Sequence, residues 1–175
     1  NVTSNKGNLI KGPLIIKPKI FFDDRGYFFE SWNHSEFNKT ISRKVNFVQD
    51  NHSESKFGVL RGLHYQLEPK AQAKLVRCTK GEVFDVLVDI RKDSDTFGEW
   101  SSVILNQQNK LQFWIPEGFV HGFISLKDNS EVQYKTNEYW YKDYERSLLW
   151  KDSNININWP ISNNNEKYKI IINHK

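Results

Sequence analysis

The stretch Gly58-Val-Leu-Arg-Gly-Leu-His-Tyr-Gln66 places a cation, an imidazole, a phenol and an amide on a short run that otherwise predicts a β-strand. Side chains alternate between the two faces of a regular strand, so Arg61 and His64 would lie on opposite faces. For both to serve one pocket, the alternation must break between them. Gly62 stands at that place, and an isolated glycine in a strand often marks a bulge or a close approach of two backbones. The simpler interpretation is a strand with one satisfied histidine and one surface arginine.

Short apolar runs separated by glycine, proline and asparagine continue on both sides of this stretch. Residues 45–51, 82–90 and 147–150 are three runs that predict strands, whereas residues 34–41 are the best candidate for a helix. Many short strands with hardly any helix are typical of a sandwich or barrel of antiparallel strands. The expected fold class is therefore all-β, with short peripheral helices.

Composition limits the class of protein further. The chain has 175 residues, a net charge of +4 and one cysteine, Cys78. This length predicts one domain over residues 1–175, with a polar and atypical segment from about residue 162. The lysines are scattered, so the charge does not predict nucleic-acid binding and suits a phosphate-bearing small molecule equally well. One cysteine excludes an internal disulfide, and the sequence shows neither an apolar run of membrane-spanning length nor a signal-peptide pattern.

A carboxylate interrupts the apolar strand Val83-Phe-Asp-Val-Leu-Val88. Such a group must be paired or lie on a wet face of the sheet. Paired with His64, Asp85 would orient the imidazole and raise its basicity, as carboxylates do in catalytic sites. Paired with an arginine, Asp85 would form a structural ion pair instead.

Three further side chains are candidates for chemistry because of what they would face. Lys74 shares a strand face with Cys78, although a lysine at the start of a strand is usually a solvated edge residue. Tyr134 shares a face with Val132, where packing is the default role of a tyrosine. His121 lies just past a predicted turn, at the start of another strand.

A metal site is not expected from the histidines. His64 and His121 lie far apart in the sequence, and the residue two beyond His64 is Gln66 rather than a second histidine. Zinc and iron sites usually combine closely spaced histidines, or two histidines with a carboxylate. A cysteine nucleophile is not supported either, because Cys78 has no base beside it in the sequence.

Ordered motifs extend from about residue 12 to residue 161. They comprise Gly-Leu-His-Tyr after Leu-Arg at residues 60–65, residues 22–30, 47–53, 71–76, 81–91 and 115–123, and the pairs Tyr134-Lys135 and Trp159-Pro160. Together they resemble the dTDP-4-dehydrorhamnose 3,5-epimerase family. The Gly-Leu-His-Tyr motif is a specific signature, and the ordered set is far more specific than any one motif.

The resemblance implies a fold and an activity. The fold would be a cupin-type jelly roll, a double-stranded β-helix that is usually a homodimer and holds no metal or other cofactor. The activity would invert C3 and C5 of a nucleotide-linked 4-keto-6-deoxy sugar, converting dTDP-4-dehydro-6-deoxy-D-glucose to dTDP-4-dehydro-L-rhamnose. By the family's pattern, His64 is the base, Tyr134 is the acid, and Lys74 stabilises the enolate oxygen. The resemblance alone implies a cytoplasmic enzyme of rhamnose or surface-polysaccharide synthesis, with no nucleic-acid or membrane partner.

The family's nucleotide and sugar contacts correspond to polar residues spread along the chain. Arginines suit the pyrophosphate, because a guanidinium can bind it through two hydrogen bonds. Contacts matching Arg25 and Glu30 are expected near the dimer interface, so dimerisation would complete the site. The corresponding residues are Arg25, Glu30, Gln49, Asp50, Asn51, Arg61, Lys74, His121 and Glu145.

Two features depart from the family's pattern. Trp140 stands where the family commonly has a tyrosine that stacks on the nucleotide base, and tryptophan can stack equally well. The family's C-terminal aspartate, which supports the catalytic histidine, has no counterpart in residues 161–175, where Asn173 falls near its place. An amide cannot stabilise an imidazolium as a carboxylate does, which leaves Asp85 to take this role alone and bears on whether both carbons are epimerised.

Three other functions stay open on the sequence. The first is a 3-only or 5-only epimerase that acts on a related 4-keto sugar nucleotide. The second, from a different class, is a metal-dependent cupin oxygenase. The third is a non-catalytic cupin that binds sugar nucleotides, an alternative that the missing aspartate keeps open.

Overall fold

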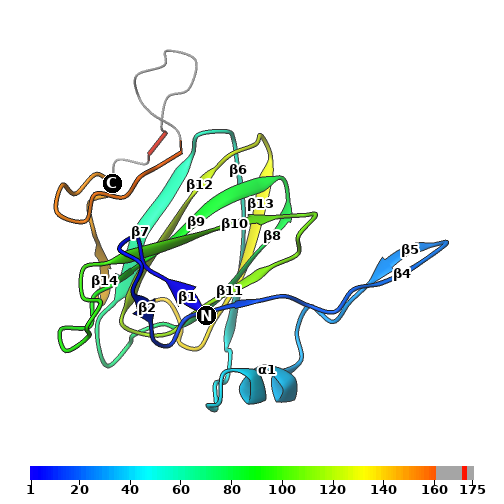
Figure 1. The fold of residues 1–175 in the computed structure, drawn as a ribbon, viewed down its shortest axis with the longest axis horizontal. Coiled ribbons are helices and arrows are strands. Elements are labelled where there is room, and N and C mark those ends of the chain that lie inside the picture. The colour runs from blue at the N-terminus through cyan, green and yellow to red at the C-terminus, as the bar shows by residue number, and fades with distance from the viewer. Residues whose placement is uncertain (161–170, 173–175) are drawn as a thin grey trace.

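Two five-stranded antiparallel sheets face each other and form a barrel (Figure 1). The computed structural model describes residues 1–160 and 171–172, so Asn173 and most of the C-terminal segment predicted as atypical lie outside the described residues. The architecture is the predicted all-β jelly roll of cupin type. Across the described residues, no helix combines the length and the apolar character needed to cross a membrane.

The first sheet contains the stretch around His64 in its fourth strand. Every neighbouring pair of strands in this sheet is antiparallel. The predicted strand at 147–150 is wrong in its bounds, because Leu148 and Trp150 pack into apolar clusters while the residues before them pair with the sheet. The order across the sheet is β10 (Trp100–Asn106), β9 (Glu82–Asp89), β12 (Phe119–Ser125), β7 (Leu60–Gln66) and β14 (Glu145–Ser147).

The second sheet supplies the opposite wall of the barrel. The predicted strand at 45–51 starts and ends too early, because Val45 and Phe47 pack in the apolar cluster around Phe37 while residues 52–55 pair with β13. The order across the sheet is β3 (Leu14–Ile16), β11 (Gln112–Ile115), β8 (Lys74–Lys80), β13 (Ser130–Thr136) and β6 (Gln49–Ser55).

A bulge in β7 confirms the break in alternation expected at Gly62. His64 pairs with His121 and Arg61 pairs with Phe123, so two residues of β7 lie opposite Gly122 alone. The φ angle of Gly62 is +121°, and a Cβ atom there would lie 2.6 Å from the Cα atom of Gly122. Only glycine fits this close approach without displacing backbone. The bulge brings Arg61 and His64 to the same face of the sheet.

The main apolar core lies between the two sheets. Val76 and Val132 from the second sheet pack with Val83, Leu87 and their neighbours from the first, and all four are fully buried. Burial of such side chains stabilises the fold by about 1.5–3 kcal/mol each. Their packing holds the two sheets together and so positions the cavity walls. Polar side chains line the remaining space between the sheets.

Peripheral elements cover the second sheet and extend beyond it. Helix α1 (His34–Thr40) confirms the predicted helix, and Asn33 caps it by accepting a hydrogen bond from the Glu36 N–H at 3.2 Å. Its Phe37 ring packs edge-on against Trp114 of β11 with 5.2 Å between the ring centroids. The hairpin of β4 (Phe21–Asp23) and β5 (Gly26–Phe28) projects away from the barrel (Figure 1). Strands β1 (Val2–Thr3) and β2 (Leu9–Ile10) pair with each other against the barrel.

Candidate active site

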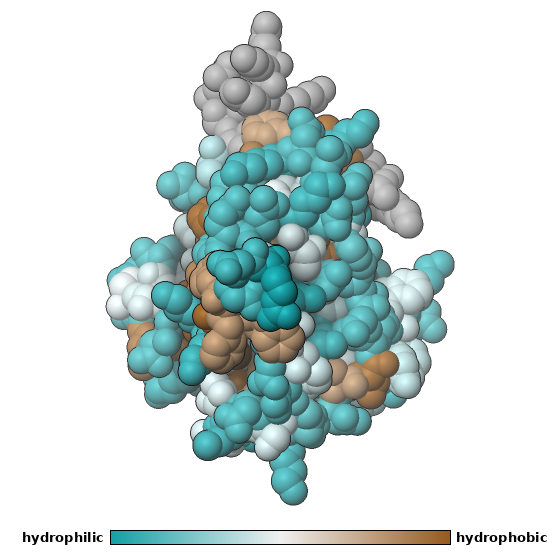
Figure 2. Space-filling model, turned by 90° about the vertical axis from the view of Figure 1, so that its right-hand side faces the viewer, coloured by the Kyte–Doolittle hydropathy of each residue, from teal (hydrophilic) through white to brown (hydrophobic). Residues whose placement is uncertain are grey.

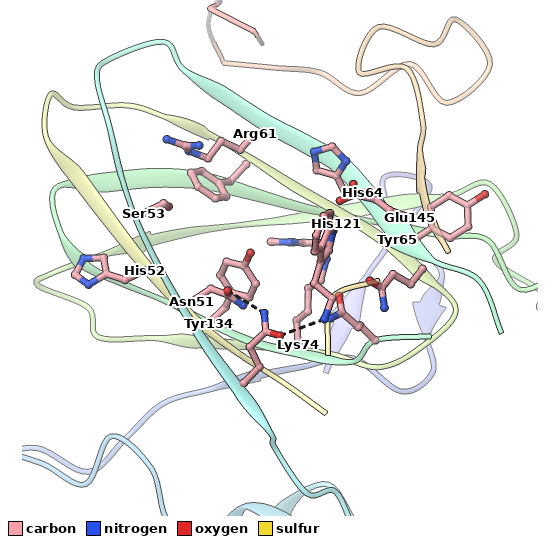
Figure 3. A pocket seen from close by; sticks show the side chains of 15 residues that line it. Asn51, His52, Ser53, Arg61, His64, Tyr65, Lys74, His121, Tyr134 and Glu145 are labelled. Carbon is pink, nitrogen blue, oxygen red and sulfur yellow. Dashed lines mark hydrogen bonds between the residues drawn. The ribbon is translucent and has the colours of Figure 1, made fainter. Parts of the chain in front are cut away.

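A cavity of about 260 Å³ opens between the two sheets. Strands β7, β12 and β14 supply one wall, and β6, β8 and β13 supply the other (Figure 3). Polar and ionisable side chains from both sheets converge on it among aromatic rings, which makes it the candidate binding site of the barrel. The residues that line it are Gln49, Asn51, His52, Ser53, Arg61, His64, Tyr65, Gln66, Gln72, Lys74, His121, Phe123, Tyr134, Trp140 and Glu145.

His64 stands on β7 at the rim of this cavity. Its Nδ1 atom lies 3.1 Å from the hydroxyl oxygen of Ser147 on β14. Partial desolvation lowers the pKa of the imidazole, and the charge of Lys74 adds to this effect while Glu145 opposes it. A lowered pKa leaves the imidazole neutral at neutral pH, which is the state that accepts a proton.

Lys74 is the first residue of β8 and lies on the same face of the strand as Cys78, as the alternation of side chains predicts. The side chain is buried, and desolvation lowers the pKa of its ammonium to about 8, although the charges of Asp85 and Glu145 act to raise it. At neutral pH most of the ammonium is therefore charged. A buried cation in a polar cavity can stabilise an oxyanion that develops beside it.

Tyr134 comes from β13 on the opposite sheet to His64. It pairs with Val76 on one side and with Asn51 on the other, and its ring enters the same cavity as His64 (Figure 3). Desolvation raises the pKa of its phenol, while the guanidinium of Arg61 acts in the opposite direction. A raised pKa keeps the phenol protonated at neutral pH, so that it can donate a proton.

Asp85 pairs with His121 and not with His64, which corrects the expected pairing. Its two carboxylate oxygens lie 2.9 and 3.0 Å from Nε2 of His121. The physical reason is strand order, because β12 separates β9 from β7 and places His121 nearer to the carboxylate. Burial raises the pKa of the Asp85 carboxyl group, and the hydrogen-bonded His121 offsets part of that rise. Asp85 therefore fixes the orientation of His121.

A second set of polar groups lies around Arg61 and Trp140. The Arg61 side chain donates hydrogen bonds to Ser55 Oγ at 3.0 Å and to the Glu54 carbonyl at 2.9 Å, which hold it on the cavity wall. The side chain of Gln49 donates to Asn51 Oδ1 at 3.0 Å and accepts from the backbone N–H of Trp140 at 3.1 Å. Trp140 is 53% exposed and offers a free aromatic face at this rim. Together these groups suit a phosphate and an aromatic base.

Four residues expected at the site do not line the cavity, namely Asp85, which is buried against His121, and three residues farther away. Asp50 lies on the other face of β6 from Gln49, where its carboxylate pairs with the Lys135 ammonium at 3.0 Å. Arg25 lies in the projecting hairpin and pairs with Asp23, and Glu30 follows that hairpin. Nine of the other expected residues reach the cavity, namely Gln49, Asn51, Arg61, His64, Lys74, His121, Tyr134, Trp140 and Glu145.

Several residues of the site escaped the sequence prediction. Gln66 shares strand parity with His64, and this signal could have identified it. Ser147 gave no such signal, because its place depends on how a three-residue strand pairs with β7. Within residues 1–160 and 171–172, no three His, Cys, Asp or Glu side chains gather as ligands for a metal ion. The remaining missed residues are His52, Ser53, Tyr65, Gln72 and Phe123.

The fold and the cavity together define the class of protein. It is a cupin-type jelly roll with a cavity between its sheets that is lined by ionisable side chains. A family model described as dTDP-4-dehydrorhamnose 3,5-epimerase matches residues 8–175. The dTDP-4-dehydrorhamnose 3,5-epimerase of Shigella flexneri is 61% identical over 150 residues, which are 86% of this chain and 83% of that protein.

Solved structures agree with this match. The dTDP-6-deoxy-D-glucose-3,5-epimerase of Legionella pneumophila, in complex with dTDP-4-keto-L-rhamnose, has a TM-score of 0.88 and 42% identity, covering 99% of this chain and 87% of that one. The Bacillus anthracis dTDP-4-dehydrorhamnose 3,5-epimerase, with TDP and PPi bound, has a TM-score of 0.86 and 41% identity, covering 92% and 89%. The chain belongs to the dTDP-4-dehydrorhamnose 3,5-epimerase family, whose members are isomerases.

Proposed function

We propose that this chain inverts C3 and C5 of dTDP-4-dehydro-6-deoxy-D-glucose and so produces dTDP-4-dehydro-L-rhamnose. The observation that carries this proposal is an imidazole and a phenol that enter one cavity from opposite sheets, with a buried ammonium in the same cavity. The activities named for the similar proteins support it.

His64 is the proposed base. The ketone at C4 acidifies the hydrogens at C3 and C5, because the electron pair left behind spreads onto the ketone oxygen as an enolate. The neutral imidazole takes the proton and becomes an imidazolium. Its lowered pKa favours the neutral form at the start of the reaction.

Lys74 is the proposed partner of the enolate oxygen. Its buried ammonium places a full positive charge in a cavity with little competing water, where such an interaction lowers the barrier most. Tyr134 then delivers its phenolic proton to the opposite face of the carbon, which inverts the centre. Solvent restores the proton to the phenolate and removes the proton from His64. No electrons are gained or lost overall, so the reaction needs no redox cofactor.

The nucleotide half of the substrate is proposed to occupy the rim around Arg61 and Trp140. The guanidinium would bind the pyrophosphate and the indole would stack on the base. His121, held by Asp85, and Glu145 would contact the sugar or the phosphates from the first sheet. Gln49 and Asn51, which line the cavity from β6, would complete these contacts.

A homodimer is also proposed. The β4–β5 hairpin carries the exposed aromatic residues Phe22, at 76% exposure, and Phe28, at 69%, while the centroid of its Tyr27 ring lies 3.9 Å from the Lys110 ammonium of the barrel. The space-filling view toward this hairpin shows apolar side chains around its charged tip (Figure 2). Exposed aromatic clusters of this kind mark protein interfaces. A second copy that receives the hairpin would bring Arg25 and Glu30 to its cavity.

Turnover of dTDP-4-keto-6-deoxyglucose in deuterated water tests the proposed reaction. NMR of the product should show deuterium at both C3 and C5, because each inversion replaces a carbon-bound proton with one from solvent. Label at only one carbon would indicate a 3-only or 5-only epimerase. Binding without any label would indicate a non-catalytic binding protein and would contradict the proposal.

A further inference from the structure

We propose that Ser147 is a positioning residue for His64. Its hydroxyl oxygen accepts a hydrogen bond from the Nδ1–H group of His64. The imidazole therefore keeps the tautomer in which Nε2 carries no proton and faces the substrate. This inference rests on the role proposed above for His64 as the base. Ser147 belongs to none of the residue sets that the sequence pattern assigns to catalysis or binding.

The backbone places the two side chains opposite each other. Ser147 and His64 are directly paired across β14 and β7, and the Leu148 N–H donates to the Leu63 carbonyl at 3.0 Å just beyond them. Directly paired residues of antiparallel strands lie about 4.5–5.5 Å apart at Cβ. The 3.1 Å contact from Ser147 Oγ to Nδ1 is therefore set by strand register and not by a flexible loop.

The hydrogen-bond pattern around the ring favours one tautomer. A neutral imidazole carries one N–H, and the partner of that N–H decides which nitrogen is left bare. In the described part of the chain, Ser147 is the hydrogen-bond partner of the His64 ring, and Nε2 has none. The carboxylate expected to support His64 is engaged elsewhere, because Asp85 binds His121. Ser147 thus occupies the orienting position that a carboxylate fills in other histidine sites.

The charged groups around His64 come from three other strands. Glu145 on β14 acts to raise the pKa of the imidazole, whereas Lys74 on β8 and His121 on β12 act to lower it. Arg61 lies on the same strand as His64 and also lines the cavity. A serine adds no charge to this set, so its effect is on the orientation of the ring. The hydrogen bond it accepts strengthens when the ring is protonated, because charge-assisted hydrogen bonds are stronger.

Nitrogen-15 NMR of the imidazole tests the inference without any turnover. The His64 ring signals are identified as those that disappear in His64→Gln. At a pH where the ring is neutral, the wild-type protein should show the Nδ1–H tautomer, and Ser147→Ala should shift the ring toward the Nε2–H form. A wild-type ring that is already Nε2–H, or a tautomer that Ser147→Ala leaves unchanged, would overturn the inference.

Kinetics supply the second readout. Ser147→Ala should lower kcat by roughly tenfold, the order expected for one lost hydrogen bond to an ionised group, with KM nearly unchanged. Ser147→Thr, which keeps the hydroxyl, should restore most of the rate. Ser102→Ala, on β10 at the far edge of the same sheet, is the matched control and should behave as wild type.

The outcomes separate this inference from the proposed function. If the wild-type protein does not turn over the sugar nucleotide, the proposed function fails, while the NMR result still decides the placement of the proton. If the wild-type protein is active and Ser147→Ala matches it in kcat and tautomer, the inference fails alone. If Ser147→Ala does not fold, the wild-type tautomer and the Ser147→Thr rate decide it.

Discussion

The cavity and the projecting hairpin place predicted site residues in opposite environments. In the cavity, His64, Lys74 and Tyr134 are fixed by strands that pair on both sides, and each has a pKa shifted by its surroundings. In the hairpin, Arg25 is exposed and its hydrogen bonds within the described part of the chain all go to Asp23 in the hairpin's own turn. Both regions match the same family by sequence, but only the cavity residues meet within one chain.

This difference shows which contacts a single chain can complete. Strand register inside the barrel is set by the core and fixes the positions of the cavity residues that this chain supplies. The hairpin buries little apolar surface of its own, so its conformation and its role depend on what packs against it. Variants in the cavity should therefore act on chemistry directly, and variants in the hairpin should act through assembly.

The largest effect is expected from His64→Gln. Removing a general base costs typically 10²–10⁴ in rate, so kcat should fall by about that factor while nucleotide binding, measured by calorimetry, stays near wild type. His34→Gln on helix α1 is the control and should leave the rate unchanged. Turnover near the wild-type rate in His64→Gln would exclude His64 as the base.

Lys74→Ala should lower kcat by roughly 10²–10³, the range measured when one oxyanion donor is removed. The intact enzyme should also lose kcat/KM as the pH rises through about 8, because the ammonium loses its proton there. On the acid side, kcat/KM should fall only below the usual pKa of histidine, since the pKa of His64 is lowered. Lys80→Ala, at the exposed end of the same strand, should leave both the acid and the alkaline limb of the pH profile of kcat/KM unchanged. An alkaline limb that persists in Lys74→Ala would assign it to another group.

Gly62→Ala should destabilise the barrel by about 1–3 kcal/mol, measured by urea unfolding, because a Cβ atom would press on the backbone of Gly122 at a positive φ angle. Gly7→Ala also has a positive φ angle, but its Cβ atom would have no heavy atom within 4 Å. The difference between the two variants isolates the close approach of β7 and β12. Equal losses would show that the bulge is not sterically required.

The smallest effect is expected from the hairpin. The double variant Phe22→Ser and Phe28→Ser should shift the protein from dimer to monomer in sedimentation and raise KM by roughly tenfold, with less change in kcat. Phe97→Ser replaces another exposed phenylalanine, at 56% exposure, and should leave assembly unchanged. A wild-type protein that is already monomeric and fully active would remove the hairpin from the site.

Local pattern identified part of the cavity, and the family resemblance added Gln49, Asn51, Trp140 and Glu145. Strand parity placed Lys74 and Tyr134 correctly, and the isolated Gly62 indicated the bulge that brings Arg61 beside His64. Parity would also have separated Asp50 from its neighbours on β6. The order of strands in the sheets could not be predicted this way, because it depends on contacts between distant segments.

That missing strand order explains the other errors. The two pairings considered for Asp85, with His64 or with an arginine, both omit His121, because nothing in the sequence indicates that β12 lies beside β9. Ser147 was missed because β14 has three residues and no apolar periodicity to mark it. In the proposed dimer the hairpin contacts a second chain, and neither local pattern nor one folded chain defines such contacts.

The central claim is that His64 and Tyr134 face one sugar from opposite sides, and exchange in Tyr134→Phe tests it most directly. With dTDP-4-keto-6-deoxyglucose in deuterated water, this variant should still form the enolate through His64 and return a deuteron to the same face. NMR should therefore show deuterium incorporated without inversion, and no incorporation in the double variant with His64→Gln. Inversion at the wild-type rate in Tyr134→Phe, or exchange that survives loss of His64, would contradict the account.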